Sequence, residues 1–494
     1  MNLSASRILA QLPERELLLS LLRLAESEDI RLYVVGGTVR DIILGRLIYD
    51  VDFAMSGDAI SFTEKFAQIA GAKAIVLDEE QKSARAIFYH GELYMDFNSI
   101  RGENVIDDLK ARDLTINAIA FDFNQLLTSD MVDLIDPCNG IDDLNNRLIN
   151  PTSSQAFIDD PVRMLRVYRF AATLNFTVPE QIASLIRTFV ALLGKVSAER
   201  IRDEFFKILD VGNSAKYIKA LDDVGVLEQI FPEIIQMKGM AQNEYHHLDV
   251  WGHSMLTLEF FEGQTVPDSL RDHLSEIESY LDYELVKGRC RRSLLKLTAL
   301  LHDIGKPLVR VIDRNGRTRF FEHHQKGADI VLEIGTRLRL SNREAKFMSS
   351  VIGYHMYPLI LSSKYSRQQV SPRGRERDAL RFVQRTEAEC LSVLLVSYAD
   401  LRATQGAWRK DRDLEDLNRL IVKIAEVYFR EIHSPMAQLV TGNDLMKVFD
   451  LSPGPIVGKL LESIKEAQFQ GKIKTRHEAL EFVRNILRRS VDAQ

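Results

Sequence analysis

Apolar and polar positions follow two different periods along this chain of 494 residues. Near the N-terminus, short apolar runs with period-two alternation predict β-strands. These runs are LYVV at 32–35, DVDFAM at 50–55, ARAIFYH at 84–90 and LYMDFNSI at 93–100. Two other segments, ISFTEKFAQIAGA at 60–72 and LTINAIAF at 114–121, predict helices. The pattern therefore predicts an α/β module over about the first 148 residues.

Beyond residue 150 the strand patterns fade, and apolar residues recur at helical spacing, as in PVRMLRVYRFAATLNF at 161–176 and ERIRDEFFKILD at 199–210. Eight of the eleven histidines lie between His246 and His355, which marks a separate helical unit. A chain of this length exceeds one hydrophobic core. We expect a head at 1–148, a helical neck and body at 149–238, a third helical unit at 239–430 and a helical tail at 431–494.

Composition places the chain among ordinary globular proteins, with 46% apolar and 27% charged residues. No apolar run has membrane-spanning length, and the first residues lack a signal-peptide core. Three scattered cysteines suit a reducing compartment, so a cytoplasmic location without membrane contact is expected. The net charge of -6 argues against non-specific nucleic-acid affinity but allows local basic stripes. Candidate stripes are 287–296, 373–385 and 472–489, although each of them alone is more often a solvated helix face.

A candidate phosphate-binding turn follows the first strand-like run. Gly36 and Gly37 stand between this run and the predicted helix TVRDIILG. Glycines there let backbone amides approach a phosphate, and the helix N-terminus adds a favourable partial charge. Arg40, one turn into the helix, can clamp the same anion. The alternative is that the two glycines form a strand-to-helix turn that binds no ligand.

Two carboxylates on the next strand form a candidate metal site. Asp50 and Asp52 are two residues apart, so their side chains share one face and repel each other unless a cation lies between them. Hard oxygen ligands favour Mg²⁺, which also bridges to substrate phosphates. Asp96 in LYMDFNS is either a third ligand or a surface residue.

The turn, the helix and the two carboxylates follow one another in GGTVRDIILGRLIYDVD at 36–52, which matches the signature of the polymerase-beta-like nucleotidyltransferases. Within that group, the chain resembles the class II tRNA nucleotidyltransferases and the related bacterial poly(A) polymerases. The resemblance implies an α/β head of that fold in which Asp50 and Asp52 hold catalytic Mg²⁺, and Asp96 is a further catalytic candidate. Arg112 and Asp113 are similar to the family's ribose-contacting motif, although Ala111 stands where the family usually has a second arginine. The alternative for Asp113 is a helix N-cap.

The segment Asp159-Asp160-Pro161-Val162-Arg163 resembles the family's amino-acid template, with Asp159 in place of the customary glutamate. We expect Asp160 and Arg163 to share a face of a helix opened by Pro161. A carboxylate accepts and a guanidinium donates, which complements the amino group and ring nitrogen of cytosine and adenine but not uracil or guanine. Arg166 and Arg169 follow Asp160 and Arg163 along the same face and can hold triphosphate or primer. The segment 197–204 is expected to brace the template.

The histidine-rich unit resembles the HD-domain phosphohydrolases through His302-Asp303 in LTALLHDIGKP. The resemblance implies an all-α HD domain and a second divalent metal of unknown identity. The remaining ligand positions that it implies are His253, His323, His355 and Asp400. Phosphate esters or cyclic phosphates at RNA ends are the substrates that this resemblance suggests.

As a whole, the resemblance predicts an enzyme that adds nucleotides from CTP and ATP to the 3′ end of tRNA, with CCA as the complete product. Only twelve residues, IRGENVIDDLKA at 100–111, separate the strand LYMDFNS from Arg112. Members of the family that complete CCA usually carry a longer flexible loop here, and the segment resembles the shorter form of the CC-adding members, so the resemblance favours CC addition over full CCA addition. Poly(A) synthesis is a second alternative. A third is that the HD domain is the main activity, with the head as a nucleotide-sensing or RNA-binding module. A purely structural RNA-binding protein is disfavoured because both sets of metal ligands are intact.

Overall fold

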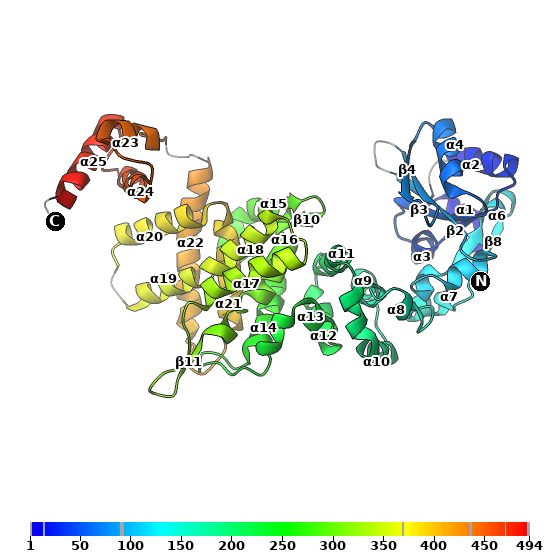
Figure 1. Cartoon of the computed structure of the whole chain (residues 1–494), viewed down its shortest axis with the longest axis horizontal. Coiled ribbons are helices and arrows are strands. Elements are labelled where there is room, and N and C mark those ends of the chain that lie inside the picture. Colours follow the sequence, from blue (N-terminus) through cyan, green and yellow to red (C-terminus); the bar gives the residue numbers. More distant parts are fainter. Residues whose placement is uncertain are drawn as a thin grey trace. The chain divides into compact units, whose positions relative to one another are not determined.

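The computed structural model describes residues 2–12, 15–88, 93–367, 370–433, 437–469 and 471–491. The chain divides into two compact units, 1–230 and 231–494 (Figure 1). None of the helices within the described ranges is long and apolar enough to cross a membrane. The finer four-part division expected from the sequence stays a prediction.

An eight-stranded mixed sheet forms the head, in the order β1-β8-β7-β2-β3-β6-β5-β4. The strands are β1 Asn2–Ser4, β2 Leu32–Val35, β3 Asp50–Met55, β4 Lys73–Asp78, β5 Ser83–Phe88, β6 Leu93–Ser99, β7 Ala120–Asp122 and β8 Met131–Ile135. The four runs predicted as strands are β2, β3, β5 and β6, although 89 and 90 of the third run lie outside the described residues.

Alternation on β3 separates a core face from a polar face. Val51 and Phe53 are fully buried, and the Phe53 ring stacks on Phe97 of β6 at 5.0 Å. Helix α4, Ala59–Ala70, packs on this face through Phe62 and Phe66. Because side chains alternate, the core packing of Val51 and Phe53 fixes Asp50 and Asp52 on the opposite face.

The predicted helix at 114–121 is wrong. A 3₁₀ turn, Thr115–Asn117, leads into strand β7, which pairs with β2 and β8. Residues Ala118 to Phe121 are fully buried, so both faces of this segment are apolar and the periodicity that separates helix from strand is lost.

Helices build the rest of the first unit. They include α3 Gly37–Leu44, α5 Val105–Lys110, α8 Ala156–Asp159, α9 Arg163–Leu174, α10 Glu180–Phe189, α11 Ala198–Leu209, α12 Ser214–Asp223 and α13 Val226–Ile230. Helix α9 packs on α11 and α12. This packing places the arginines of α9 beside the acidic side chains of α11.

The second unit is mainly helical, with two small two-stranded sheets. One pairs β9 Glu284–Val286 with β10 Arg289–Cys290, and the other pairs β11 Arg310–Ile312 with β12 Thr318–Phe320. Its first helices are α14 Val250–Gly263, α16 Arg291–Leu301, α17 His323–Arg337, α18 Asn342–Tyr354 and α19 Met356–Arg367. They are followed by α20 Pro372–Thr386, α21 Cys390–Ala403 and α22 Asp411–His433. Helix α21 is buried along most of its length and packs on α14, α16, α18 and α19, so a polar side chain on it is enclosed by several helices.

The tail consists of α23 Gly442–Phe449, α24 Pro455–Phe469 and α25 Arg476–Val491 around a small core of its own. Ion pairs engage several side chains of the predicted basic stripes. Arg377 and Arg381 pair with Glu466 of α24, and Lys296 is buried against Glu262. These cations therefore contribute to the packing of the fold.

Candidate active site

The turn after β2 requires glycine. Gly36 has φ +71°, and a Cβ there would lie 2.7 Å from Arg112 Nη1. A Cβ on Gly37 would lie 3.3 Å from Asp52 Oδ2. The two glycines thus bring the start of α3 against the carboxylates of β3 and against Arg112, in the arrangement that the sequence predicted for a phosphate-binding turn.

Thr38 fixes α3 to β3. Its hydroxyl donates to the carbonyl of Asp50 at 3.2 Å and accepts from the amide of Asp52 at 2.7 Å. These two hydrogen bonds, to the same edge of the strand, set the distance between the helix N-terminus and both carboxylates. Thr38 is a positioning residue that the sequence did not reveal.

Three carboxylates meet on the polar face of the sheet. Asp52 lies directly beside Asp96 in the parallel register of β3 and β6. The pKa of Asp52 is raised to about 6, chiefly by burial and also by Asp96 and Asp50, while Arg112 and Arg40 oppose this rise. The pKa of Asp50 is also raised, by burial and by Asp96, with Arg85 opposing. Crowded carboxylates with raised pKa values are arranged to hold a divalent cation.

Asp96 is not a surface residue, since its side chain is 14% exposed. Arg85 of β5 donates two hydrogen bonds to it, at 2.6 and 2.7 Å. This bidentate pair fixes the orientation of Asp96 beside Asp52. Whether Asp96 is a ligand stays a prediction.

Arg40 and Arg112 line the same side of the turn. Arg40 donates to Asn117 Oδ1 at 2.7 Å and pairs with Asp41 at 2.8 Å. Arg112 donates through Nε to Asp108 at 3.1 Å. The structure therefore brings both cations to the carboxylate face, where the sequence expected contacts to phosphate and ribose.

Asp113 uses both carboxylate oxygens within the protein. Oδ1 accepts from the amide of Leu114 at 2.9 Å and from Asn117 at 3.2 Å, and Oδ2 pairs with Arg166 at 2.7 Å. Burial raises the pKa of Asp113, but Arg166 outweighs burial and lowers it. The N-cap alternative is wrong, because the following 3₁₀ turn begins after Leu114 and has no side-chain cap.

The expected placement of Asp160 and Arg163 on one helix is wrong. Helix α8 ends at Asp159, Asp160 is extended, and α9 begins at Arg163. The two side chains still meet across this turn, with Arg163 Nε 4.0 Å from Asp160 Oδ2. Pro161 interrupts the helix, because the residue before a proline is driven to extended backbone.

Neighbouring elements hold this pair in place. Arg200 of α11 donates to Asp160 at 2.7 Å, and Arg163 donates to the carbonyl of Ala111 at 3.3 Å. Asp160, but not Arg163, lines a depression of about 400 Å³ together with Pro161 and Arg200. The segment at 197–204 therefore contacts Asp160 through Arg200, and its role as a brace of a template stays a prediction.

Arg166 and Arg169 lie on α9 and face Glu204 of α11, at 3.5 and 2.9 Å. The guanidinium of Arg169 stacks 3.9 Å from the Phe170 ring centroid. Burial lowers the pKa of Arg169 to about 10, with Glu204 opposing. Both arginines are thus tied to the α9–α11 packing, and their contact with triphosphate or primer stays a prediction.

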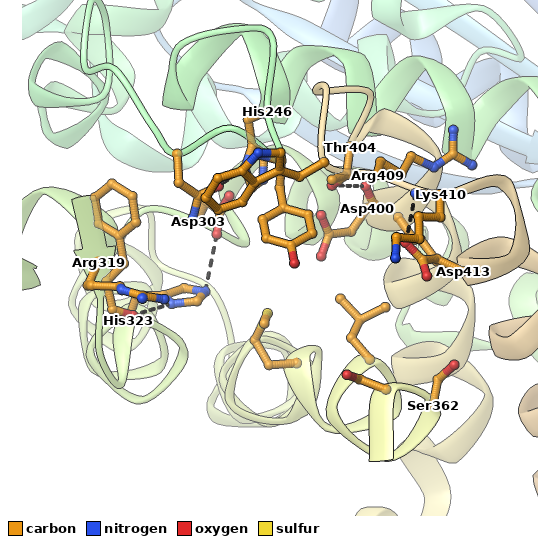
Figure 2. A pocket seen from close by; sticks show the side chains of 18 of the residues that line it. His246, Asp303, Arg319, His323, Ser362, Asp400, Thr404, Arg409, Lys410 and Asp413 are labelled. Atoms are coloured by element: carbon orange, nitrogen blue, oxygen red, sulfur yellow. Dashed lines mark hydrogen bonds and ion pairs between the residues drawn. The ribbon is translucent and has the colours of Figure 1, made fainter. Parts of the chain in front are cut away.

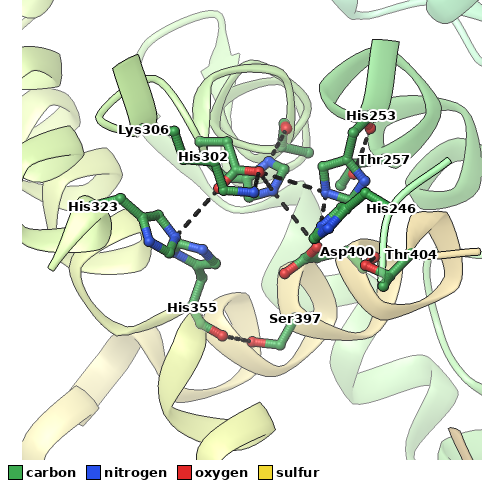
Figure 3. Close-up of polar contacts among 12 residues, drawn as sticks. His246, His253, Thr257, His302, Lys306, His323, His355, Ser397, Asp400 and Thr404 are labelled. Carbon is green, nitrogen blue, oxygen red and sulfur yellow. Dashed lines mark hydrogen bonds and ion pairs between the residues drawn. The ribbon is translucent and has the colours of Figure 1, made fainter. Parts of the chain in front are cut away.

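A second site lies in the HD unit, where the structure brings the six expected ligands together. Figure 3 labels five of them, His253, His302, His323, His355 and Asp400. His302 caps the end of α16, and Asp303 follows it. His253 of α14 lies 3.0 Å from Asp400 of α21, and His302 lies 3.2 Å from Asp303. His323 of α17 lies 3.3 Å from Asp303, and the ring of His355 is 5.1 Å from that of His302.

Burial and neighbouring charges shift the pKa values of the histidines in this cluster strongly. Burial lowers the pKa of His302, but Asp303 and Asp400 outweigh burial and raise it to about 10. Burial lowers the pKa of His355 to about 3 and that of His323 to about 4. Two groups of residues can each hold a metal ion, namely His253, His302 and Asp400, and His302, Asp303 and His355.

A cavity of about 500 Å³ reaches this cluster (Figure 2). Asp303, His323 and Asp400 line its inner end. Its lining also includes several cationic and aromatic side chains beside serines, aliphatic residues and Asp413; the cationic and aromatic ones include Lys306, Arg319, Phe320, Arg367, Trp408, Arg409, Lys410 and Arg412. This lining suits an anionic ligand with an aromatic group.

Comparison with known sequences decides the family. The poly A polymerase head domain matches residues 32–150, the HD domain 270–404, and domain 2 of the tRNA nucleotidyltransferases 413–483. An A-adding tRNA nucleotidyltransferase of Deinococcus radiodurans is 30% identical over 461 residues, covering 91% of this chain and 94% of the relative. The chain belongs to the class II tRNA nucleotidyltransferases.

Further relatives of this tRNA nucleotidyltransferase with its fused HD domain differ in the nucleotides that their names say they add. A CC-adding tRNA nucleotidyltransferase of Thermus thermophilus is 28% identical over 91% of this chain and 92% of its own. A solved CCA-adding enzyme shares the fold, with a TM-score of 0.65, 21% identity, and coverage of 98% of this chain and 97% of that one. A Thermotoga maritima CCA-adding enzyme complexed with tRNA gives 0.63 at 21% identity and 99% of both chains. Family membership makes the chain an enzyme of tRNA 3′-end addition.

Several functional residues of the nucleotidyltransferase were missed from its sequence. Lys306 lies 2.6 Å from Asp303 Oδ2, and the ring centroid of His246 is 4.7 Å from that of His253. The position of Lys306 in the HDIGK run and the density of histidines around His246 were available signals. Asn117 and Asp108 gave none, because their roles depend on contacts with Arg40 and Arg112 that only the fold creates.

Proposed function

We propose that this tRNA nucleotidyltransferase adds two cytidylates to tRNA from CTP and stops before adenylate. The observation that carries the proposal is the short, immobilised connection between β6 and Arg112. Asp108 receives hydrogen bonds from Arg101 at 2.8 Å and from Arg112 at 3.1 Å, and its side chain is 3% exposed. Leu109 is fully buried in a core cluster with Val35.

This connection also holds the template. The carbonyl of Ala111, directly after α5, accepts from Arg163 at 3.3 Å. To read adenine after cytosine, Arg163 and Asp160 must be re-aimed, because the two bases differ in size and in the position of the amino group. A segment fixed at Asp108 and Leu109 opposes that movement. A template pair that cannot be re-aimed accepts only one of the two bases.

In the proposed reaction the 3′ hydroxyl oxygen of tRNA attacks the α-phosphorus of CTP. The new phosphorus–oxygen bond replaces the bond to pyrophosphate, which leaves, and the hydroxyl proton passes to solvent. Asp50 and Asp52, with Asp96, are the proposed ligands of Mg²⁺, which when bound activates the hydroxyl and stabilises the departing pyrophosphate.

Other side chains orient the substrates in this proposal. Asp160 accepts from the cytosine amino group, while Arg163 donates to the ring nitrogen. Arg112 contacts the ribose, and Arg40 beside the Gly36 turn contacts phosphate. The tRNA is gripped by its backbone and shape, and the enzyme acts in the cytoplasm.

Addition of adenylate alone is a second candidate, because the Deinococcus radiodurans relative at 30% identity is A-adding. A fixed template is equally compatible with one adenylate as with two cytidylates. Complete CCA addition and poly(A) synthesis both need ATP to be accepted as well. Incorporation assays separate these cases.

We expect transcripts ending at the discriminator base or at C to incorporate label from CTP, and transcripts ending at CC to incorporate none from ATP. Label from ATP on CC-ending RNA, without any from CTP on the shorter RNAs, would identify an A-adding enzyme instead. Both labels would show complete CCA addition, and unlimited ATP incorporation on any RNA would show a poly(A) polymerase.

We further infer a metal-dependent phosphohydrolase activity of the HD domain, carried by the enclosed histidine and carboxylate cluster at the end of the cationic cavity. Water oxygen attacks the phosphorus of a phosphate ester or cyclic phosphate at an RNA end, and the ester oxygen leaves with a proton. Bound metal supplies an activated water at neutral pH.

We expect His302→Ala to abolish release of phosphate, or opening of a 2′,3′-cyclic phosphate, while tRNA addition continues at the parental rate. The Asp50→Ala/Asp52→Ala chain is the reciprocal control and should retain hydrolysis. Hydrolysis that survives His302→Ala would contradict the inference.

A further inference from the structure

We propose that the open face of strands β6, β5 and β4, beside Asp50 and Asp52, binds the single-stranded 3′ end of tRNA. On this face the ring of Tyr94 stacks on a base near the RNA end, and Arg85 and Lys73 contact backbone phosphates. The proposal rests on the role of Asp50 and Asp52 in nucleotide addition proposed above, and it names the surface along which the RNA end reaches them.

Strand register places two rows of side chains on the polar face of the sheet, because paired residues on neighbouring strands point to the same face. Each row starts at a carboxylate of β3 and crosses β6 and β5 to the edge strand β4. The first row is Asp50, Tyr94, Ile87 and Lys73, and the second is Asp52, Asp96, Arg85 and Ile75. The polar face therefore extends from the proposed magnesium ligands to the edge of the sheet.

Helix α4 covers one face of these strands, and the two rows lie on the other face. The helix packs on β4, β5 and β6 from the core side (Figure 1). On the polar side, Ile75 is 38% exposed, Lys73 is exposed, and Tyr94 and Ile87 are partly exposed. Lys73 forms no ion pair within the part of the chain that the structure describes. An accessible aromatic ring beside a free cation is the combination with which proteins bind single-stranded nucleic acid.

Arg85 is held in a fixed orientation with one nitrogen free. Its Nε and Nη2 donate to the two oxygens of Asp96 at 2.6 and 2.7 Å, and its guanidinium carbon lies 4.9 Å from the ring centroid of Tyr94. Nη1 has no hydrogen-bond partner among the described residues, and the side chain is 32% exposed. This nitrogen can therefore donate to a phosphate oxygen while the bidentate pair with Asp96 stays intact.

The position of the nucleotide-binding turn determines which side of the carboxylates is left for RNA. Gly36 follows β2, and Arg40 lies on α3, which packs on β2 and β3. Strands β2 and β6 flank β3 on opposite sides. In phosphoryl transfer the attacking and leaving oxygens lie roughly in line across the phosphorus. Since pyrophosphate leaves toward the Gly36 turn, the 3′ hydroxyl approaches from the β6 side, where the two rows lie.

The test compares Tyr94→Ala with Tyr94→Phe in the full chain. Single-turnover addition from CTP to a tRNA transcript that ends at the discriminator base is measured against RNA concentration and, separately, against CTP concentration. We expect Tyr94→Ala to raise the half-saturating RNA concentration about 10- to 100-fold, because a base loses its stacking partner, and to leave the half-saturating CTP concentration within about twofold. Tyr94→Phe keeps the ring and should behave as the parent.

Lys73→Ala tests the phosphate contact at the edge of the sheet. RNA binding is measured in the Asp50→Ala/Asp52→Ala background, which cannot extend the transcript. We expect weaker binding and a slope of log Kd against log salt that is smaller in magnitude by about 0.7, the value for one phosphate contact on a single strand. Val76→Ala is the matched control, because Val76 is exposed on the same strand but pairs with Ala84 on the opposite face. It should bind RNA as tightly as the parent.

Parental dependence on RNA concentration in Tyr94→Ala, or an unchanged salt slope in Lys73→Ala, would overturn the RNA surface. An equal rise in the half-saturating RNA and CTP concentrations would also overturn it, because it would show a general distortion of the site. If the parent chain adds no nucleotide, or the Asp50→Ala/Asp52→Ala chain still adds one, the catalytic role of the carboxylates fails instead, and the binding measurements still decide the RNA surface. They also decide it if Tyr94→Ala does not fold, since Lys73 is exposed.

Discussion

Replacing Asp52 by asparagine is expected to lower nucleotide addition to tRNA about 10³-fold or more. The amide keeps the shape of the side chain but loses the negative charge that the proposed metal site needs beside Asp50 and Asp96. Loss of metal-assisted charge stabilisation amounts to several kcal/mol, and about 1.4 kcal/mol corresponds to each factor of ten. Single-turnover incorporation of labelled CTP measures the effect.

Asp58→Asn serves as the matched control, because Asp58 is exposed at the start of α4 and outside the carboxylate face. The folded pKa of Asp52, about 6, lies above the ordinary value of 3.8. In the metal-free chain the ionised carboxylate therefore destabilises the fold above pH 6, and this cost disappears as the pH falls below 4. Metal-free Asp52→Asn should thus melt no lower than the parent at pH 8. Nucleotide addition by Asp52→Asn within tenfold of the parental rate would contradict the assignment of Asp52 as a metal ligand.

Replacing Asp160 by alanine is expected to reduce the preference for CTP over UTP by about 10- to 100-fold in kcat/KM. Uracil presents an acceptor where cytosine presents its amino donor, so the Asp160 carboxylate repels uracil and pairs with cytosine. Leaving a buried polar group unpaired costs about 1 to 3 kcal/mol, which is the discrimination that the variant loses. Competition between the two labelled triphosphates on one transcript measures the ratio.

Asp159→Ala provides the comparison, since Asp159 is the adjacent carboxylate but is exposed and bonded to Gln155 at 2.9 Å. It should leave the ratio of CTP to UTP unchanged. Asp160→Ala also frees Arg200, so overall activity is expected to fall in addition. A retained preference for CTP in Asp160→Ala would show that another group reads the base.

Local sequence determined four strands of the head, β2, β3, β5 and β6, and the position of its carboxylates. Alternation places Asp50 and Asp52 on one face of β3, and Gly36 is required by the backbone conformation at the turn. These features depend only on residues close to one another in the chain, which is why the segment from Gly36 to Asp52 could be interpreted from the sequence. The buried stretch 118–121 was misassigned because apolar residues on both faces carry no period.

The tertiary structure decided the contacts between distant segments. His253 and Asp400 are 147 residues apart and meet because α14 packs on α21. Asp108 joins Arg101 to Arg112, and Ala111 holds Arg163, through pairings that no local pattern records. The sequence by itself determined which residue types were available and their local faces. Only the packing of helices and the strand register decided which of them meet, because those distances depend on the whole core.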